Sequence, residues 1–239
     1  MRAVLTFHSI DERPGPLSYS PRGFSALLDA LSEARLPVRS LDELLGQPNA
    51  HGVALTFDDG ISTVYADAMP ILRERRIPAH VFVISRWVGG ESRWPQKESS
   101  ATPFRLMDWD QLEALQSAGF SIEGHTASHP DVRSLSGTEI EAEMEEADST
   151  IERRLGRRPR YFAYPFGYYD AAARAVAKKR YAGSFTTRLD YLEGRIELDA
   201  IPRLDAHYLR SPALVRSLPG KRAHAYIALR RALRRFRGH

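Results

Sequence analysis

Asp58 and Asp59 are two adjacent carboxylates whose type and position suit chemistry. They follow the apolar run 53–57 and precede Gly60. An apolar run of this length predicts a buried strand. Because side chains alternate along a strand, two neighbouring acids reach one site only where the strand ends and turns. Gly60 permits that turn. One carboxylate could then ligate a metal while the other moves a proton, although Asp-Asp-Gly is also an ordinary turn sequence.

Two histidines, His125 and His129, follow a second short strand-like stretch, residues 120–124, and precede Pro130. Imidazoles at i and i+4 lie on one side of a helical turn, a spacing that lets both reach one divalent ion. Two histidines and one Asp leave room for water, as in catalytic metal sites. The alternative is a solvated histidine pair, which is weakened because each polar pair follows a predicted strand.

A third candidate is the aromatic segment 161–169, in which Pro165 and Gly167 interrupt an apolar strand-like start. These two residues force an irregular turn. A turn of this kind can aim backbone N–H groups at a developing oxyanion. We interpret Tyr161 and Phe162 as core residues.

Three motifs in this order resemble those of the NodB-type polysaccharide deacetylases, carbohydrate esterase family four, and the resemblance extends from Met1 to about Asp205. The motifs are Thr56-Phe57-Asp58-Asp59-Gly60, His125-Thr-Ala-Ser-His129 and Phe162-Ala-Tyr-Pro165-Phe-Gly167. The resemblance implies an α/β fold, a single distorted (β/α) barrel with about seven strands.

The resemblance also assigns roles to residues at the site. It implies that Asp58 is the general base and that the backbone N–H of Phe166 is the oxyanion donor. The implied metal ligands are Asp59, His125 and His129. Zn²⁺ is the expected ion, with Co²⁺, Ni²⁺ and Mn²⁺ as alternatives.

Two departures from the family pattern concern the base and the acid. Many members carry an arginine in the third motif that braces the base, where this chain has Ala163. We expect Arg203 to replace it, the alternative being a surface charge. Near the C-terminus only Leu204-Asp-Ala-His207 has the Leu-x-x-His spacing in which most members carry the acid. A strand over residues 2–7 ends at His8, similar to the opening element of the permuted branch that includes poly-N-acetylglucosamine deacetylases, so His8 is the expected general acid and His207 the alternative.

The segment 85–108 has no clear periodicity, and a connection this long in one domain is usually functional. Because it follows a predicted barrel strand, we expect it to lie over the catalytic mouth as a lid or sugar-contacting loop. The alternative is an insertion without function. Trp94 is the candidate for stacking on a sugar ring, and Tyr164 and Tyr168 are further candidates for substrate binding.

Alternating strands and helices are expected along the chain. Strands are predicted at residues 2–7, 37–40, 53–57, 79–84, 120–124 and 161–164. Helices are predicted at residues 24–34, 65–75 with an interruption at Pro70, 109–118, and 138–155. The last is predicted to start at a capping box, Thr138-x-x-Glu141, and to stop at Gly156. His80 is interpreted as a core residue.

The composition favours one large domain, residues 1–220, followed by a basic tail, residues 221–239. The chain has 239 residues, 43% of them hydrophobic, and no long uninterrupted apolar stretch, which argues against a transmembrane helix. It has no cysteine, so disulfide and thiolate chemistry are excluded. A strand beginning at residue 2 leaves no room for a secretory signal, so a cytoplasmic location is expected if the start is native.

Positive charge is concentrated at the C-terminus. From Ala206 onward there are nine Lys or Arg residues and no acid; subtracting these nine from 34 leaves 25 basic and 30 acidic residues, a balance of −5. On a helical wheel Tyr226, Leu229, Leu233 and Phe236 share one face. Such a helix suits the inner face of an anionic membrane better than nucleic acid. The alternative is a helix packed on the barrel.

The predicted function is metal-dependent hydrolysis of an N-acetyl group on an N-acetylated amino sugar or glycan precursor, in the synthesis of cell-surface polysaccharide or glycolipid. Three alternatives remain open: a deformylase of a lipid-linked amino sugar, a non-catalytic carbohydrate-binding relative, and a glycosyltransferase. The last would have no need of the histidine pair, and the non-catalytic relative would be expected to lack Asp58.

Overall fold

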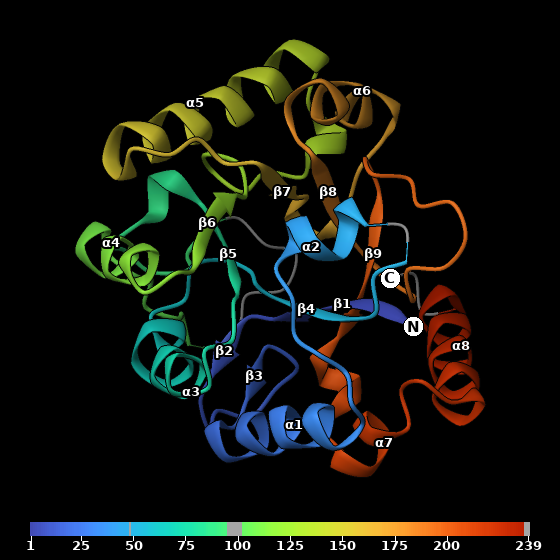
Figure 1. The fold of residues 1–239 in the computed structure, drawn as a ribbon. Coiled ribbons are helices and arrows are strands. Elements are labelled where there is room, and N and C mark those ends of the chain that lie inside the picture. The colour runs from blue at the N-terminus through green and yellow to red at the C-terminus, as the bar shows by residue number, and fades with distance from the viewer. Residues whose placement is uncertain (48, 95–101, 237–239) are drawn as a thin grey trace.

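Parallel strands and surrounding helices make up most of the chain in the computed structural model, which describes residues 1–47, 49–94 and 102–236 (Figure 1). Seven strands form a closed barrel in chain order, with β1 pairing both β4 and β9. These strands are β1 (Arg2–Phe7), β4 (Gly52–Phe57), β5 (His80–Val83), β6 (Ser121–Gly124), β7 (Tyr161–Ala163), β8 (Gly183–Leu189) and β9 (Ile201–Asp205). The predicted α/β barrel with about seven strands is therefore confirmed.

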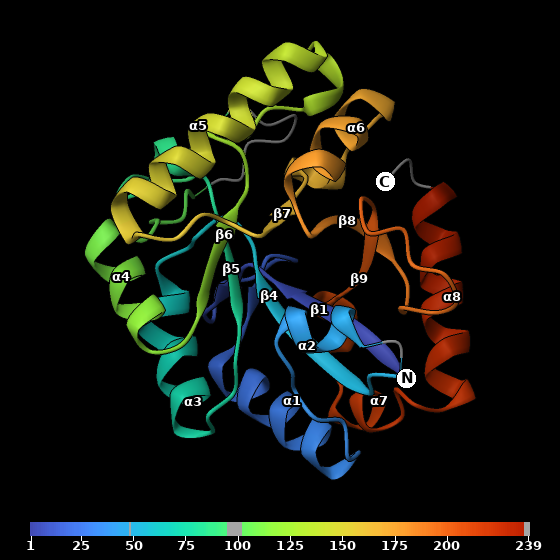
Figure 2. The same cartoon turned by 45° about the horizontal axis from the view of Figure 1, so that its top comes forward.

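Helices surround the barrel, and one short helix lies across one of its ends (Figures 1 and 2). They are α1 (Pro21–Glu33), α2 (Leu41–Gly46), α3 (Met69–Glu74), α4 (Trp109–Ser117), α5 (Gly137–Leu155), α6 (Ala171–Arg180), α7 (Pro212–Arg216) and α8 (Lys221–Phe236). A separate two-stranded sheet joins β2 (Ser9–Ile10) to β3 (Ser18–Tyr19). No helix of the described residues is both long and apolar enough to cross a membrane.

The barrel strands are apolar on both faces, as buried parallel strands must be. In β1 the side chains of Leu5 and Phe7 pack outward against the helices, whereas Val4 points into the barrel and joins a second cluster with Ala54 and Phe82. This alternation of inward and outward side chains follows from the period of two along a strand. Packing on both sides fixes the register of the strands and so the position of every residue at their ends.

The end of the barrel at which the strands begin is closed by α2 and a buried His80. The backbone N–H of Leu41 donates to His80 Nε2 at 3.0 Å, so the other ring nitrogen carries the proton and donates to Glu123 at 3.3 Å. Glu123 in turn accepts the N–H groups of Arg160 and Tyr161. His80 is thus a core residue, as predicted. The site lies at the opposite end of the barrel, where the strands end.

Three predictions about elements were wrong in detail. Residues 37–40 do not form a strand; Val38 makes a single bridge to Val53. The predicted helix at 65–75 is a π-helical turn over Val64–Ala68 that continues directly into α3, and Pro70 is the second residue of α3.

The third wrong detail is the start of α5. Its capping box is formed by Ser136 and Glu139, two residues earlier than predicted. The Ser136 hydroxyl accepts the Glu139 N–H, and the Glu139 carboxylate accepts the Ser136 N–H. The helix ends as expected at Gly156, whose φ of 72° lies in the left-handed region.

Candidate active site

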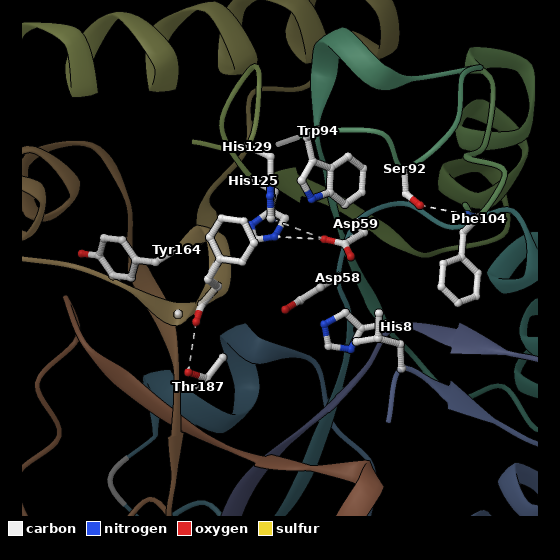
Figure 3. Close-up of a pocket in the computed structure, with 13 residues that line it drawn as sticks. His8, Asp58, Asp59, Ser92, Trp94, Phe104, His125, His129, Tyr164 and Thr187 are labelled. Atoms are coloured by element: carbon white, nitrogen blue, oxygen red, sulfur yellow. Dashed lines mark hydrogen bonds and ion pairs between the residues drawn. The ribbon is translucent and has the colours of Figure 1, made fainter. Parts of the chain in front are cut away.

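The residues predicted to do chemistry meet at the carboxyl ends of the barrel strands, around a cavity of about 120 Å³ (Figure 3). Asp58 and Asp59 stand directly after β4, and the chain turns at Asp59, which has a φ of 70°, as well as at Gly60, with a φ of 69°. The turn therefore begins one residue earlier than predicted. The left-handed backbone of Asp59 is uncommon for a residue other than Gly, and it accompanies the turn that brings both carboxylates to one mouth.

Asp58 is held by Arg203, which comes from β9. The Arg203 Nη1 donates to Asp58 Oδ1 at 2.7 Å and Nη2 donates to Oδ2 at 2.6 Å, a bidentate pair with both side chains buried. The Nε of Arg203 donates to the Thr186 carbonyl at 3.1 Å. The arginine absent from position 163 is thus replaced in space by an arginine from a different strand.

The predicted metal ligands lie together beside this pair. The Nε2 atoms of His125 and His129 are 3.3 and 3.7 Å from Asp59 Oδ1. One donor atom from each of the three buried residues lies within 4.8 Å of the others. Two imidazole nitrogens and one carboxylate oxygen converging on a single point suit a divalent transition metal such as Zn²⁺.

A backbone carbonyl fixes the orientation of the first histidine. His125 Nδ1 lies 2.7 Å from the Ala163 carbonyl oxygen, which can only accept, so Nδ1 carries the proton. The Nε2 lone pair then faces Asp59. This arrangement, in which a ligating histidine donates its other N–H to a carbonyl, is the usual support for a metal ligand. The residues present therefore fit a metal ion.

The loop that carries the two histidines is not the helical turn predicted from their spacing. Thr126 and His129 both have a φ of 64°, outside any α-helix. The Thr126 hydroxyl accepts the His129 N–H at 3.0 Å. From α5, Glu143 accepts the N–H groups of Ala127 and Ser128 at 3.1 and 2.8 Å. Glu143 is a positioning residue that the sequence did not single out.

Burial and mutual charge set the ionisation of the site. Burial would raise the pKa of Asp58, but the Arg203 guanidinium outweighs it and holds that pKa below its usual value. For Asp59 burial acts in the same direction, but the contact with His125 and the nearby imidazoles outweighs it and lowers the pKa. Burial, assisted by His125, lowers the pKa of His129 to about 3. Both carboxylates are therefore anionic and His129 is neutral, the forms that a metal site requires.

His8 lies at the end of β1 and lines the cavity opposite the metal ligands (Figure 3). His207 is not among the described residues that line the cavity. It lies in the 3₁₀ turn Ala206–Leu209, and its ring contacts that of Tyr208. The geometry brings His8 to the site and leaves the alternative outside it.

The third motif forms the wall beside His129. Phe166, in the 3₁₀ turn Pro165–Gly167, has a φ of 57°, and its carbonyl accepts the Thr187 hydroxyl at 3.3 Å. Its ring contacts His129 with centroids 4.5 Å apart. The expected irregular turn is present, and the Thr187 contact holds its backbone in place.

The three aromatic residues expected to bind substrate are placed less favourably. Tyr164 lines the cavity but is 1% exposed, and its hydroxyl donates to the Asp199 carbonyl away from the site. Trp94 is 4% exposed and packs on His129, with ring centroids 4.8 Å apart. Tyr168 does not line the cavity; the Arg133 guanidinium lies 3.8 Å from its ring centroid. Trp94 and Tyr164 are wall residues, and a sugar ring has no open face of Trp94 on which to stack.

The segment 85–108 contributes to the cavity, as expected from its place after β5. Ser92, Trp94 and Phe104 line the site, and the Ser92 hydroxyl accepts the Phe104 N–H at 2.8 Å, which ties the two sides of the segment together. Residues 95–101 of this segment lie outside the described residues. Whether the segment moves as a lid stays a prediction.

Four residues of the cavity were not singled out from the sequence: Leu17, Ser92, Phe104 and Thr187. Thr187 belongs to β8, which was not predicted as a strand. A Cβ at Gly167 would lie 2.2 Å from the Thr187 hydroxyl, and its φ is 70°, so only Gly fits there. The Pro-Phe-Gly sequence signals the turn at this position but not its contact with Thr187.

Replacing Arg203 by Met is expected to lower the free energy of unfolding by about 3–5 kcal/mol, because Asp58 would stay buried and charged without its partner. Arg203→Lys keeps the charge but cannot make two parallel N–H···O bonds, so a smaller loss is expected. Urea unfolding of the three proteins at neutral pH measures both effects. Equal stability of the Met variant and the parent would show that the ion pair does not hold the base.

Comparison with known proteins shows which family the chain resembles. Residues 46–181, more than half of the chain, match the family model described as polysaccharide deacetylase. The chain is 25% identical over 133 residues to the putative polysaccharide deacetylase YxkH of Bacillus subtilis, covering 56% of this chain and 43% of that protein. It is 28% identical over 119 residues to a chitin deacetylase of Colletotrichum lindemuthianum, covering 50% and 43%. The chain thus spans less than half the length of these relatives.

Two solved structures share the fold over nearly the whole chain. IcaB from Ammonifex degensii superposes with a TM-score of 0.76 at 22% identity, covering 90% of this chain and 97% of that one. The Streptococcus pyogenes deacetylase PplD superposes with a TM-score of 0.73 at 23% identity, covering 85% and 91%. Because the family model matches more than half of the chain, including all three motifs and the strands β4 to β7, the chain belongs to the polysaccharide deacetylase family.

Proposed function

We propose that the protein is a metal-dependent hydrolase that removes the N-acetyl group from an N-acetylated amino sugar. The observation that carries this proposal is the pairing of a buried, arginine-held carboxylate, Asp58, with the donor set of Asp59, His125 and His129 at one cavity. A divalent ion held by these three residues would lower the pKa of a bound water toward about 7 and polarise the acyl carbonyl.

The side chains around this position divide the remaining work. Asp58, anionic and fixed by Arg203, accepts a proton from the attacking water through a carboxylate oxygen. The backbone N–H of Phe166 donates to the oxygen that becomes negative as the carbonyl is attacked. His8 donates a proton to the departing amine. The products are acetate and a free amino sugar.

The substrate class is proposed on the same site and on the relatives. One relative is a poly-β-1,6-N-acetyl-D-glucosamine N-deacetylase of Staphylococcus aureus, and others are chitin deacetylases. The small cavity, with Leu17, Trp94 and Phe104 in its wall, suits a short acyl group with an apolar end. A formyl group would fill less of it, and one methyl contact is worth about 10–200-fold in specificity.

Amine release from purified protein tests the function. N-acetylated and N-formylated amino sugars should be supplied in polymeric, lipid-linked and nucleotide-linked form, with Zn²⁺ or Co²⁺ and without any sugar donor. Hydrolysis that prefers the N-acetyl compound supports the proposal; preference for the N-formyl compound assigns a deformylase. Metal-saturated protein that binds these sugars but releases no amine would be a binding relative.

We further propose that the protein acts in the cytoplasm, at the inner membrane face, on a lipid-linked or nucleotide-linked precursor in the synthesis of cell-surface polysaccharide or glycolipid. Support comes from exposed leucines on α8 beside basic side chains. Faster hydrolysis of the linked precursors than of the polymer is the expected result of the same screen.

His8→Ala is expected to lower kcat by about 10²–10⁴-fold, because the leaving amine loses its proton donor. His207→Ala, outside the cavity, should change kcat little. Both variants should keep their metal content, measured by atomic emission, and their unfolding temperature. The opposite order of the two effects would assign the acid to His207 and would reject the proposed relation to the permuted branch.

A further inference from the structure

Helix α8 carries an apolar surface that the barrel does not cover. Among the described residues three large apolar side chains are exposed, and two of them lie on this helix: Leu229 at 58% and Leu233 at 42%. The third, Leu198 at 49%, lies in the segment between β8 and β9. Leu229 and Leu233 are four residues apart and therefore share one face of the helix.

The opposite face of α8 holds the helix to the barrel. Ala223 and Ile227 are fully buried, and the His224 ring stacks on Tyr191 with centroids 4.0 Å apart. Arg231 pairs with Asp190. Both views place the helix along the side of the barrel next to the N-terminus (Figures 1 and 2). The two leucines are therefore not needed to hold the helix to the barrel. The expected alternative of a helix packed on the barrel is observed, and binding to a membrane stays a prediction.

Basic side chains lie beside the exposed leucines. The half-buried Arg230 follows Leu229 directly, and its guanidinium lies 4.6 Å from the centroid of the Tyr208 ring. Arg234 turns toward the barrel instead, and its Nη1 is buried. Arg222 is exposed at the start of the helix. Since the sequence has no acid after Ala206, nothing on α8 itself neutralises these charges.

We infer that the outer face of α8 binds the surface of an anionic lipid bilayer, with Leu229 and Leu233 at the level of the upper acyl chains and the arginines against the lipid phosphates. An amphipathic helix with bulky apolar residues between cations fits this interface. A second copy of the chain is a poorer fit, because an isologous contact would bring arginines of one sign together. This surface is independent of the proposed hydrolysis.

Binding to vesicles tests the inference with a matched control. Leu229→Ser/Leu233→Ser should weaken binding to phosphatidylglycerol-containing vesicles by about tenfold or more. Leu198→Ser removes an equally exposed leucine elsewhere and should leave binding unchanged. Neither variant touches Ala223 or Ile227, so all three proteins should unfold at the same temperature. Truncation of α8 would uncover the barrel and is not a suitable substitute.

The charge contribution has its own test. Lys221→Gln/Arg222→Gln, which removes two exposed charges, should weaken binding to anionic vesicles and reduce its dependence on salt, because exposed charges are screened within about 10 Å at 0.1 M salt and about 3 Å at 1 M. Vesicles of phosphatidylcholine alone should bind weakly and without salt dependence.

Three results would overturn the inference. The first is no binding to anionic vesicles at low salt, and the second is an equal loss in Leu198→Ser. The third is a concentration-dependent dimer that Leu229→Ser/Leu233→Ser abolishes, which would assign the face to a second copy. A DNA duplex serves as the control for charge alone. If the parent and Leu229→Ser/Leu233→Ser bind DNA equally but only the parent binds anionic vesicles, the apolar face is required for the bilayer and the inference is supported.

Discussion

Asp58→Asn is expected to lower kcat by about 10²–10⁴-fold while the metal remains bound. An amide at this position has the shape of the carboxylate but cannot accept the proton of the attacking water. The metal donors, Asp59, His125 and His129, keep their own geometry, because His125 is oriented by the Ala163 carbonyl and not by Asp58. Amine release and metal content, measured on the same preparation, check the two halves of this result.

A loss of stability could imitate a loss of chemistry in this variant, because Arg203 would be left buried beside a neutral partner. Breaking a buried pair from one side costs about 3–5 kcal/mol, whereas replacing both partners by neutral groups is often harmless. The double variant Asp58→Asn/Arg203→Met should therefore unfold more like the parent and still be inactive. Activity that returns with stability in the double variant would show that Asp58 is not the base.

The sequence was sufficient to predict those parts of the site that are local in the chain. Asp58 with Asp59, the histidine pair, and the Pro165–Gly167 turn each follow an apolar stretch, and each stretch forms a barrel strand. Because the carboxyl ends of parallel strands meet at one end of a barrel, residues that follow different strands come together without any detail of packing.

The parts that could not be derived depend on contacts between distant segments. The strand β9 contains Pro202 and a buried charge, Arg203, so its sequence does not resemble an apolar strand. The 145-residue separation between Arg203 and Asp58 is closed only by the barrel. The prediction for Arg203 rests on the resemblance to the family, in which an arginine at the position of Ala163 holds the base. It does not rest on the periodicity of the sequence.

The histidine loop shows the opposite failure. A spacing of four residues suggested a helical turn, but Glu143 of α5 accepts two backbone N–H groups of the loop and stabilises a different path. Both backbone paths bring the two imidazoles together. The predicted grouping of His125 and His129 is therefore observed although the predicted helical turn is wrong. Spacing limits which residues can share a ligand, and the tertiary partner decides the backbone.

Removing either histidine ligand is expected to abolish the stabilisation of the fold by metal as well as turnover. An ion that binds only the folded protein raises its free energy of unfolding by about 2.7 kcal/mol at a free concentration 100 times the dissociation constant. The parent should therefore unfold at a higher temperature with Zn²⁺ than with chelator. His125→Ala and His129→Ala should show no such difference, because each removes one of three buried donors.

His207→Ala is the matched control, because His207 follows a barrel strand as His125 does but does not line the cavity. It should keep the full increase in unfolding temperature with Zn²⁺. The measurement needs no substrate, so a wrong substrate class would leave it unaffected and the metal site and the reaction are tested separately. A Zn²⁺-dependent increase that persists in both ligand variants would place the ion elsewhere on the protein. An increase lost in His125→Ala but kept in His129→Ala would leave Asp59 and His125 as donors, and the two-histidine site would be wrong.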